Sequence, residues 1–181
     1  MKKILFFLII VAASFVFQST GFQTVANAAW GEDVLVTLET PYTDQLKPSM
    51  DEAPNGDLYI AAEYPSLAAI RVYKSMDGGE NWGPVITFID TGNILNPSLI
   101  YAYGIEDWVF ITYEQVLPDN SRSIRLFRFN PANPDNHDWI TIASGIYMPA
   151  DQHIQPEICT ESLYYNYYWM YVTYSIDAID Y

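Results

Sequence analysis

Hydrophobic and aromatic residues recur in short runs from residue 47 onward, and turn-forming residues such as Pro54-Asn55-Gly56-Asp57 separate the runs. Val, Ile, Tyr, Phe and Trp dominate the runs, and these residues favour strands. The predicted strands are Pro48–Glu52, Leu58–Tyr64, Ile70–Ser75, Val85–Ile89, Pro97–Tyr103, Trp108–Gln115, Ser123–Phe129, Trp139–Ala143, Gln155–Thr160 and Tyr167–Ser175. Beyond residue 28 no amphipathic helical pattern of ten or more residues occurs, so the sequence predicts an all-β fold.

The strands fall into a repeat that a proline introduces. The three starting points are Lys47-Pro48-Ser49, Asn96-Pro97-Ser98 and Gln155-Pro156-Glu157, and an aromatic-rich run follows each proline at a similar offset. Four antiparallel strands in about 50 residues are typical of a β-propeller blade. The sequence therefore predicts one blade at residues 47–95, a second at 96–154 and the start of a third at 155–181.

The third repeat stops after its second predicted strand. A propeller usually closes with four to eight blades, and an open one would expose strand edges that native proteins protect. We therefore expect residues 1–181 to be the N-terminal part of a longer protein. An additional strand is predicted at Asp33–Leu38, within an N-terminal region at 29–46 that precedes the repeats.

One loop of the first repeat carries a motif. Ser75, Asp77, Gly79 and Trp82 fit the pattern Ser-x-Asp-x-Gly-x-x-Trp, and at these positions the sequence resembles the Asp-box, or bacterial neuraminidase repeat, of sialidase-like β-propellers. In such a turn Ser and Asp side chains can hydrogen-bond the backbone, glycine can adopt a positive φ, and tryptophan can bury its ring. The resemblance implies a structural role, at the blade periphery, rather than catalysis.

The second repeat keeps only a remnant of this motif. Ala132, Pro134 and Asn136 stand where Ser, Asp and Gly would stand, and Trp139 alone matches, in a stretch expected to be a loop. The sequence therefore predicts a degenerate Asp-box in the second blade.

The resemblance also raises the question of catalysis. It implies that an active sialidase would have an arginine triad, a tyrosine–glutamate pair and an aspartate acid/base, but Lys47-Pro48-Ser49 replaces the expected Arg-Ile-Pro. Asp51 and Glu52 are the weak candidates for a catalytic carboxylate. The four arginines are expected on solvated strand faces, and they are Arg71, Arg122, Arg125 and Arg128.

The N-terminus has the layout of a secretory signal peptide. Lys2 and Lys3 precede an apolar run at Ile4–Phe17, and Ala26-Asn27-Ala28 offers a cleavage site. The run would span roughly 21 Å as a helix, less than the ~30 Å of a bilayer core. The sequence thus predicts a signal peptide at residues 1–28, with an uncleaved anchor as the alternative, a secreted or cell-surface location, and no later membrane span.

Charge and composition exclude some partners. With 22 acidic and 8 basic residues, the formal net charge is −14, which disfavours nucleic acid and anionic membranes. Cys159 is the only cysteine, so an internal disulfide is excluded, and we expect its side chain to be buried. His137 and His153 are not part of a ligand-spaced cluster, and neither a metal nor a cofactor is expected.

The functional prediction follows from these features. The sequence favours an exported, non-catalytic propeller that binds glycans or extracellular proteins. The alternatives are an exo-sialidase or other glycoside hydrolase whose catalytic residues lie mainly beyond Tyr181, and a processive polysaccharide hydrolase with paired carboxylates along a cleft.

Overall fold

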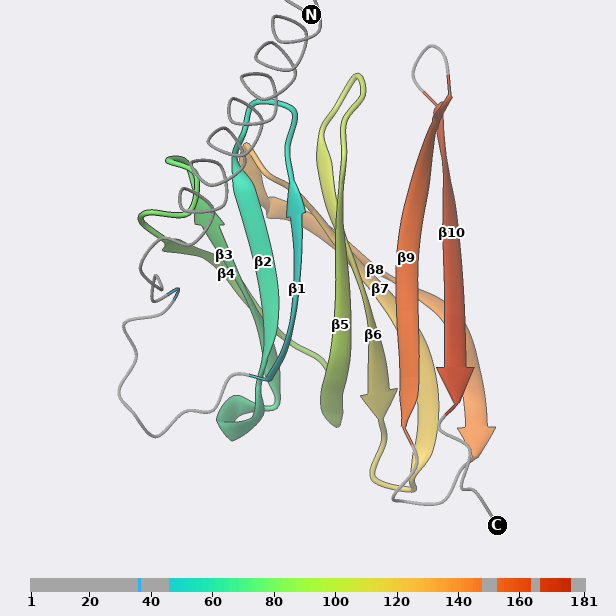
Figure 1. Cartoon of the computed structure of the whole chain (residues 1–181). Helices are drawn as coiled ribbons and strands as arrows, with labels where there is room; N and C mark the ends of the chain where they lie inside the picture. Colours follow the sequence, from blue (N-terminus) through green and yellow to red (C-terminus); the bar gives the residue numbers. More distant parts are fainter. Residues whose placement is uncertain (1–35, 37–45, 148–152, 164–166, 177–181) are drawn as a thin grey trace, which may run out of the picture. The chain divides into compact units, whose positions relative to one another are not determined.

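The computed structural model describes residue 36 and residues 46–147, 153–163 and 167–176 (Figure 1). The predicted signal peptide at 1–28 lies outside the described residues. So does the predicted strand at Asp33–Leu38, apart from Val36, which occupies a bend.

The described residues form strands and one short 3-10 helix, η1 (Pro65–Leu67). Each strand predicted for the repeats has a counterpart in the structure. The strands are β1 (Leu46–Glu52), β2 (Leu58–Tyr64), β3 (Ala69–Ser75), β4 (Gly83–Ile89), β5 (Asn93–Ala102), β6 (Trp108–Val116), β7 (Ser121–Asn130), β8 (Asn133–Tyr147), β9 (Ile154–Leu163) and β10 (Tyr167–Ile176). They form two four-stranded antiparallel sheets, β1–β4 and β5–β8, and a two-stranded sheet, β9–β10. We call these the first, second and third sheets. The predicted all-β fold with four-stranded antiparallel sheets is confirmed, and their succession along the chain is the one expected for propeller blades.

The second sheet differs from the prediction at its last hairpin. Strand β8 begins at Asn133 rather than at Trp139, and Asn133 pairs with Asn130 across a tight turn. The Asn130 side-chain oxygen accepts hydrogen bonds from the backbone N–H groups of Ala132 (2.9 Å) and Asn133 (3.2 Å). These bonds stabilise a short turn, so β8 begins directly after it. The remnant expected at Ala132, Pro134 and Asn136 therefore does not form a box-like loop, and the prediction of a loop here is wrong.

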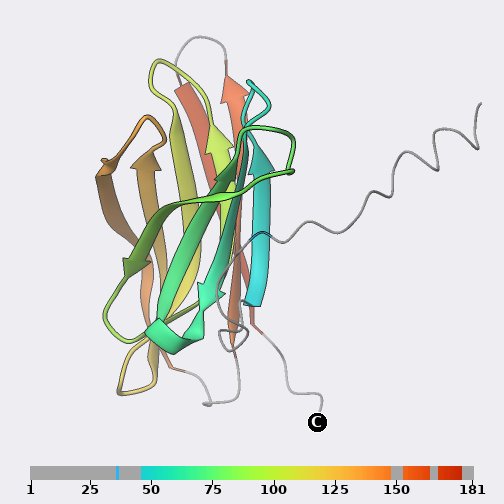
Figure 2. The ribbon, with the colours of Figure 1, turned by 90° about the vertical axis from the view of Figure 1, so that its left-hand side faces the viewer.

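The first and second sheets pack face to face, as Figure 2 shows from the side of the first sheet. The shared core contains the buried residues Ala53, Tyr59, Ala61, Ile70, Val72, Phe88, Ile94, Leu99, Val109, Ile111, Tyr113, Phe127 and Phe129. Phe88 of β4 stacks on Phe127 of β7 with ring centroids 4.1 Å apart. Gly92 links the two sheets at φ +80, where an added Cβ would lie 2.2 Å from the Val116 carbonyl oxygen. Only glycine fits this connection without a shift of the backbone.

The third sheet packs on the other face of the second. Ile158 of β9 joins Ala102, Phe110 and Leu126 in a smaller apolar cluster. Because residues alternate along a strand, Cys159 points away from this cluster and is exposed, so the prediction that it is buried is wrong. Among the described residues, no helix has the length and apolarity that a membrane crossing requires.

Candidate ligand-binding site

The first strands of the three sheets, β1, β5 and β9, lie side by side (Figure 1). Side chains rather than backbone ladders join them. Ser49 Oγ accepts a hydrogen bond from the Leu99 N–H (2.9 Å), and Ser98 Oγ accepts one from the Ile158 N–H (3.2 Å). These serines occupy the same place in successive repeats, one residue after the proline. The same contact therefore recurs at both junctions and sets the three strands in one register.

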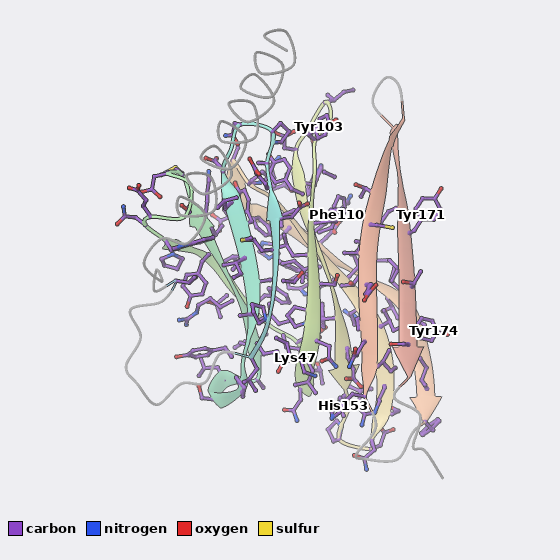
Figure 3. The ribbon with its side chains drawn as sticks, in the orientation of Figure 1. Lys47, Tyr103, Phe110, His153, Tyr171 and Tyr174 are labelled. Atoms are coloured by element: carbon purple, nitrogen blue, oxygen red, sulfur yellow. The ribbon has the colours of Figure 1, made fainter. Side chains whose placement is uncertain are left out.

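This register brings the three proline motifs of the sequence to one place. Together they line a hollow of about 430 Å³. Its lining residues are Lys47, Pro48, Ser49, Asn96, Pro97, Ser98, Gln155, Pro156 and Glu157. In Figure 3, Lys47 and His153 lie at this end of the strands, while Tyr103 lies at the opposite end. The repeat thus builds one concave site from three separated segments.

The backbone at the site is unusual in two of the three repeats. Lys47 (φ +49) and Asn96 (φ +53) are both in the left-handed region, and both precede a proline. The strand register shifts at each of these positions, between Leu46 and Ser49 and between Leu95 and Ser98. Such bulges re-aim side chains and often lie beside functional sites. Here they turn the Lys47 and Asn96 side chains to the wall of the hollow.

A polar cluster lies next to this wall: the buried residues Glu63, Asn96, Glu114 and Arg122, and the partly exposed His153. Glu114 and Arg122 are 0% and 1% exposed at their side chains and form an ion pair. His153 Nδ1 lies 3.2 Å from Glu114 Oε2 and 3.3 Å from Arg122 Nη1. Buried charges of this kind are tolerated only when they are paired and hydrogen-bonded. The cluster therefore ties the wall of the hollow to the interior of the second sheet.

The carboxylates singled out in the sequence lie elsewhere. Asp51 accepts hydrogen bonds from the backbone N–H groups of Tyr101 (2.8 Å) and Glu52 (2.9 Å), so its carboxylate joins the first and second sheets. Glu52 is exposed at the end of β1. Neither residue is among those that line the hollow. Within the described residues, the carboxylate that lines it belongs to Glu157.

The motif residues Ser75, Asp77, Gly79 and Trp82 form a closed hydrogen-bonded turn between β3 and β4. Ser75 Oγ donates to Asp77 Oδ1 (2.8 Å) and accepts from the Gly79 N–H (2.8 Å). Asp77 accepts from the Asn81 backbone (2.9 Å) and side chain (2.7 Å), and Trp82 Nε1 donates to the Gly79 carbonyl (3.0 Å). Gly79 has φ +96. The side chains of the motif are thus engaged with one another and with the turn.

The turn should make stability depend on pH through Asp77. The Asn81 side-chain and backbone hydrogen bonds lower the pKa of Asp77 to about 2, from 3.8. A lowered folded-state pKa adds stability above about pH 4 that is lost as pH falls toward 2. We expect thermal unfolding of the wild type and of Asp77→Asn to differ most above about pH 5, with the difference shrinking as pH falls to 2. Glu80→Gln removes a carboxylate from the same turn and serves as the control; an Asp77→Asn difference that does not vary with pH would contradict the assignment.

The arginines do not all lie on a solvated face. Arg122 is buried, and for this residue the prediction is wrong: its guanidinium pairs with the buried carboxylate of Glu114 on the neighbouring strand. Arg125 lies 3.4 Å from Asp90, and Arg128 makes a bidentate pair with Asp138 (2.8 and 2.7 Å). None of these arginines is among the residues that line the hollow.

Sequence reasoning missed Glu63, Glu114 and the role of Asn96. The sequence did contain a signal for the two glutamates, since each stands near the end of the second strand of its repeat. In the structure the cross-strand pairs Leu46–Glu63 and Leu95–Glu114 place them at equivalent positions beside the two bulges. An acidic residue repeated at one position of an otherwise apolar strand indicates a buried, partnered carboxylate. Among the described residues, no group of three or more His, Cys, Asp or Glu side chains is arranged to hold a metal ion.

No family model matches the sequence, and no curated protein matches it. Among solved structures, the chain is similar to an α-L-arabinanase of Penicillium chrysogenum complexed with arabinobiose. The sequence identity is 14%, the TM-score is 0.44, and the match covers 80% of this chain and 66% of the arabinanase chain. The match thus spans just under two thirds of that protein.

Proposed function

We propose that this chain is an exported propeller module that binds a neutral saccharide in the hollow where β1, β5 and β9 meet, and that it is not itself a hydrolase. The observation that carries the proposal is the convergence of the three proline motifs on one concave site. The signal-like N-terminus supports export. The Ser75-to-Trp82 motif supports a place in the sialidase superfamily.

The chemistry of the lining favours a saccharide. It combines the hydroxyls of Ser49 and Ser98, the amide of Gln155, one ammonium and one carboxylate with three proline rings. A sugar presents hydroxyls that both donate and accept, together with apolar C–H faces. A hollow of about 430 Å³ lies within the usual range of small-molecule sites, whereas protein partners bury flatter surfaces of about 800 Å². A glycan is therefore favoured over an extracellular protein.

The charges favour a neutral, non-catalytic site. Lys47 and Glu157 give the lining one positive and one negative group, and the formal net charge of −14 repels anions. Glycoside hydrolysis usually requires two carboxylates about 5–10 Å apart, and among the described residues the lining holds one. A sialoside would need arginines, which the described lining lacks.

The test is calorimetric titration of the full chain with cellobiose, arabinobiose and 3′-sialyllactose. We expect at least one neutral disaccharide to bind with a dissociation constant of about 10 µM to 1 mM, and the sialoside to bind at least tenfold more weakly. Gln155→Trp, which places an indole in the hollow, should abolish binding. Asn136→Trp, on the exposed strand β8, should not.

Three results would count against the proposal. They are the absence of binding by either neutral sugar, unchanged binding by Gln155→Trp, and preference for the sialoside. Release of reducing sugar from a bound disaccharide would instead support the hydrolase alternative.

A further inference from the structure

Asn96 contacts all three sheets from its position on the wall of the hollow. Its backbone N–H donates to Glu63 Oε1 in the first sheet (2.6 Å). Its Nδ2 donates to Glu114 Oε2 in the second sheet (3.0 Å) and to the Ile154 carbonyl in the third (2.9 Å). Its Oδ1 accepts from Lys47 Nζ. The amide of one residue thus connects the polar groups of three separate repeats.

The backbone of Asn96 is adapted to this role. The residue is 6% exposed, has φ +53 and stands at the register shift of β5. Asparagine is among the few non-glycine residues that tolerate the left-handed region. At the shift its N–H leaves the β5–β6 ladder and becomes available to Glu63, while its side chain is aimed at β9. The strained backbone and the hydrogen bonds therefore support one another.

We propose that Asn96 is the positioning residue of the hollow: it holds Lys47 and strand β9 in place around the ligand, so that ligand binding and docking of the third sheet are coupled. This inference rests on the proposed saccharide function. Because Ile154 begins the strand that carries Gln155, Pro156 and Glu157, loss of the Asn96 amide frees one third of the lining. By linkage, a ligand that needs the docked third sheet also stabilises its docking.

The test uses Asn96→Gly in the full chain. Glycine accepts φ +53 and keeps the backbone N–H to Glu63, so the bulge and the fold should persist while the side-chain bonds to Lys47, Glu114 and Ile154 are lost. We expect affinity for the better-binding neutral disaccharide to fall at least tenfold. Asn120→Gly is the matched control, since Asn120 is an exposed turn residue at φ +61 outside the hollow, and it should bind like the wild type.

A second readout separates positioning from general stability. The Ile158 N–H bonds to Ser98 Oγ across the junction of the second and third sheets, so its hydrogen exchange reports docking. Without ligand, exchange at Ile158 should be at least tenfold faster in Asn96→Gly than in the wild type or Asn120→Gly. Saturating disaccharide should slow it in the wild type and much less in Asn96→Gly.

Glu63 offers a rescue experiment on the same network. Glu63→Ala removes the acceptor for the Asn96 N–H, whereas Glu63→Gln retains an Oε1 acceptor in the same place. We expect Glu63→Gln to keep at least half of the wild-type affinity and Glu63→Ala to lose it. Equal losses in the two variants would overturn the inference.

The outcomes also separate this inference from the proposed function. If the wild type binds a disaccharide and Asn96→Gly binds it equally well, Asn96 is not a positioning residue and the proposed function stands. If the wild type binds no sugar, the proposed function fails, and the exchange rate of Ile158 still decides: faster exchange in Asn96→Gly supports positioning of β9, and unchanged exchange overturns it.

Discussion

Glu114→Ala is expected to destabilise the fold by about 3–5 kcal/mol, because it leaves the Arg122 guanidinium buried without its carboxylate partner. The two side chains are 0% and 1% exposed, so water cannot replace the lost partner. Glu114 also accepts from Asn96 and faces His153, so its removal leaves further polar groups unsatisfied. Urea denaturation followed by tryptophan fluorescence measures the loss.

Two comparisons separate burial from the mere presence of an ion pair. Asp138→Ala breaks the Arg128–Asp138 pair, whose side chains are 32% and 49% exposed, and should cost no more than about 1 kcal/mol. The double variant Glu114→Gln/Arg122→Met removes both charges together and should recover much of the stability lost in Glu114→Ala. A loss in Glu114→Ala as small as that in Asp138→Ala would show that the pair is not buried.

Phe127→Ala is expected to cost about 3–5 kcal/mol, the usual range for loss of a fully buried aromatic ring. Phe127 is 0% exposed, stacks on Phe88 at 4.1 Å and has the Trp139 ring 5.1 Å away. The ring lies between the first and second sheets, so the cavity would weaken their association as well as the second sheet itself. The same urea denaturation measures the effect.

The control for this variant is Ile89→Ala, at a residue that is 60% exposed and should change stability by less than about 1 kcal/mol. Phe127→Leu fills part of the cavity and should lie between the wild type and Phe127→Ala. If Phe127→Ala were no worse than Ile89→Ala, the face-to-face packing of the two sheets would be refuted.

Most of the fold could be predicted from the sequence, because each strand is a short run of apolar and aromatic residues between turn residues. Leu58–Tyr64 was predicted with the bounds that it has in the structure. The start of β8 was not predicted, because its first residues, such as Pro134 and Asn136, are of types that usually indicate a loop. In the structure the Asn130 side chain closes a tight turn, and these polar residues lie on an edge strand. Pattern alone cannot separate the two.

The site was only half predictable. The proline motifs are visible as repeat landmarks, but their convergence depends on side chains that join strands about 50 residues apart, such as Ser49 to Leu99. Arginine and glutamate usually lie on protein surfaces, so the burial of Arg122 and Glu114 cannot be predicted unless their pairing is known. Local patterns therefore located the strands, whereas the polar cluster required the packing of three sheets.

The most direct test of the account is a titration of the isotopically labelled chain with the better-binding neutral disaccharide, followed by backbone amide chemical shifts. The hollow predicts that the largest shifts occur at Ser49, Ser98 and Glu157, from three different sheets, and that they saturate with one dissociation constant. Shifts confined to a single sheet, or centred on the outer strand β8, would contradict a site built from the three converging motifs.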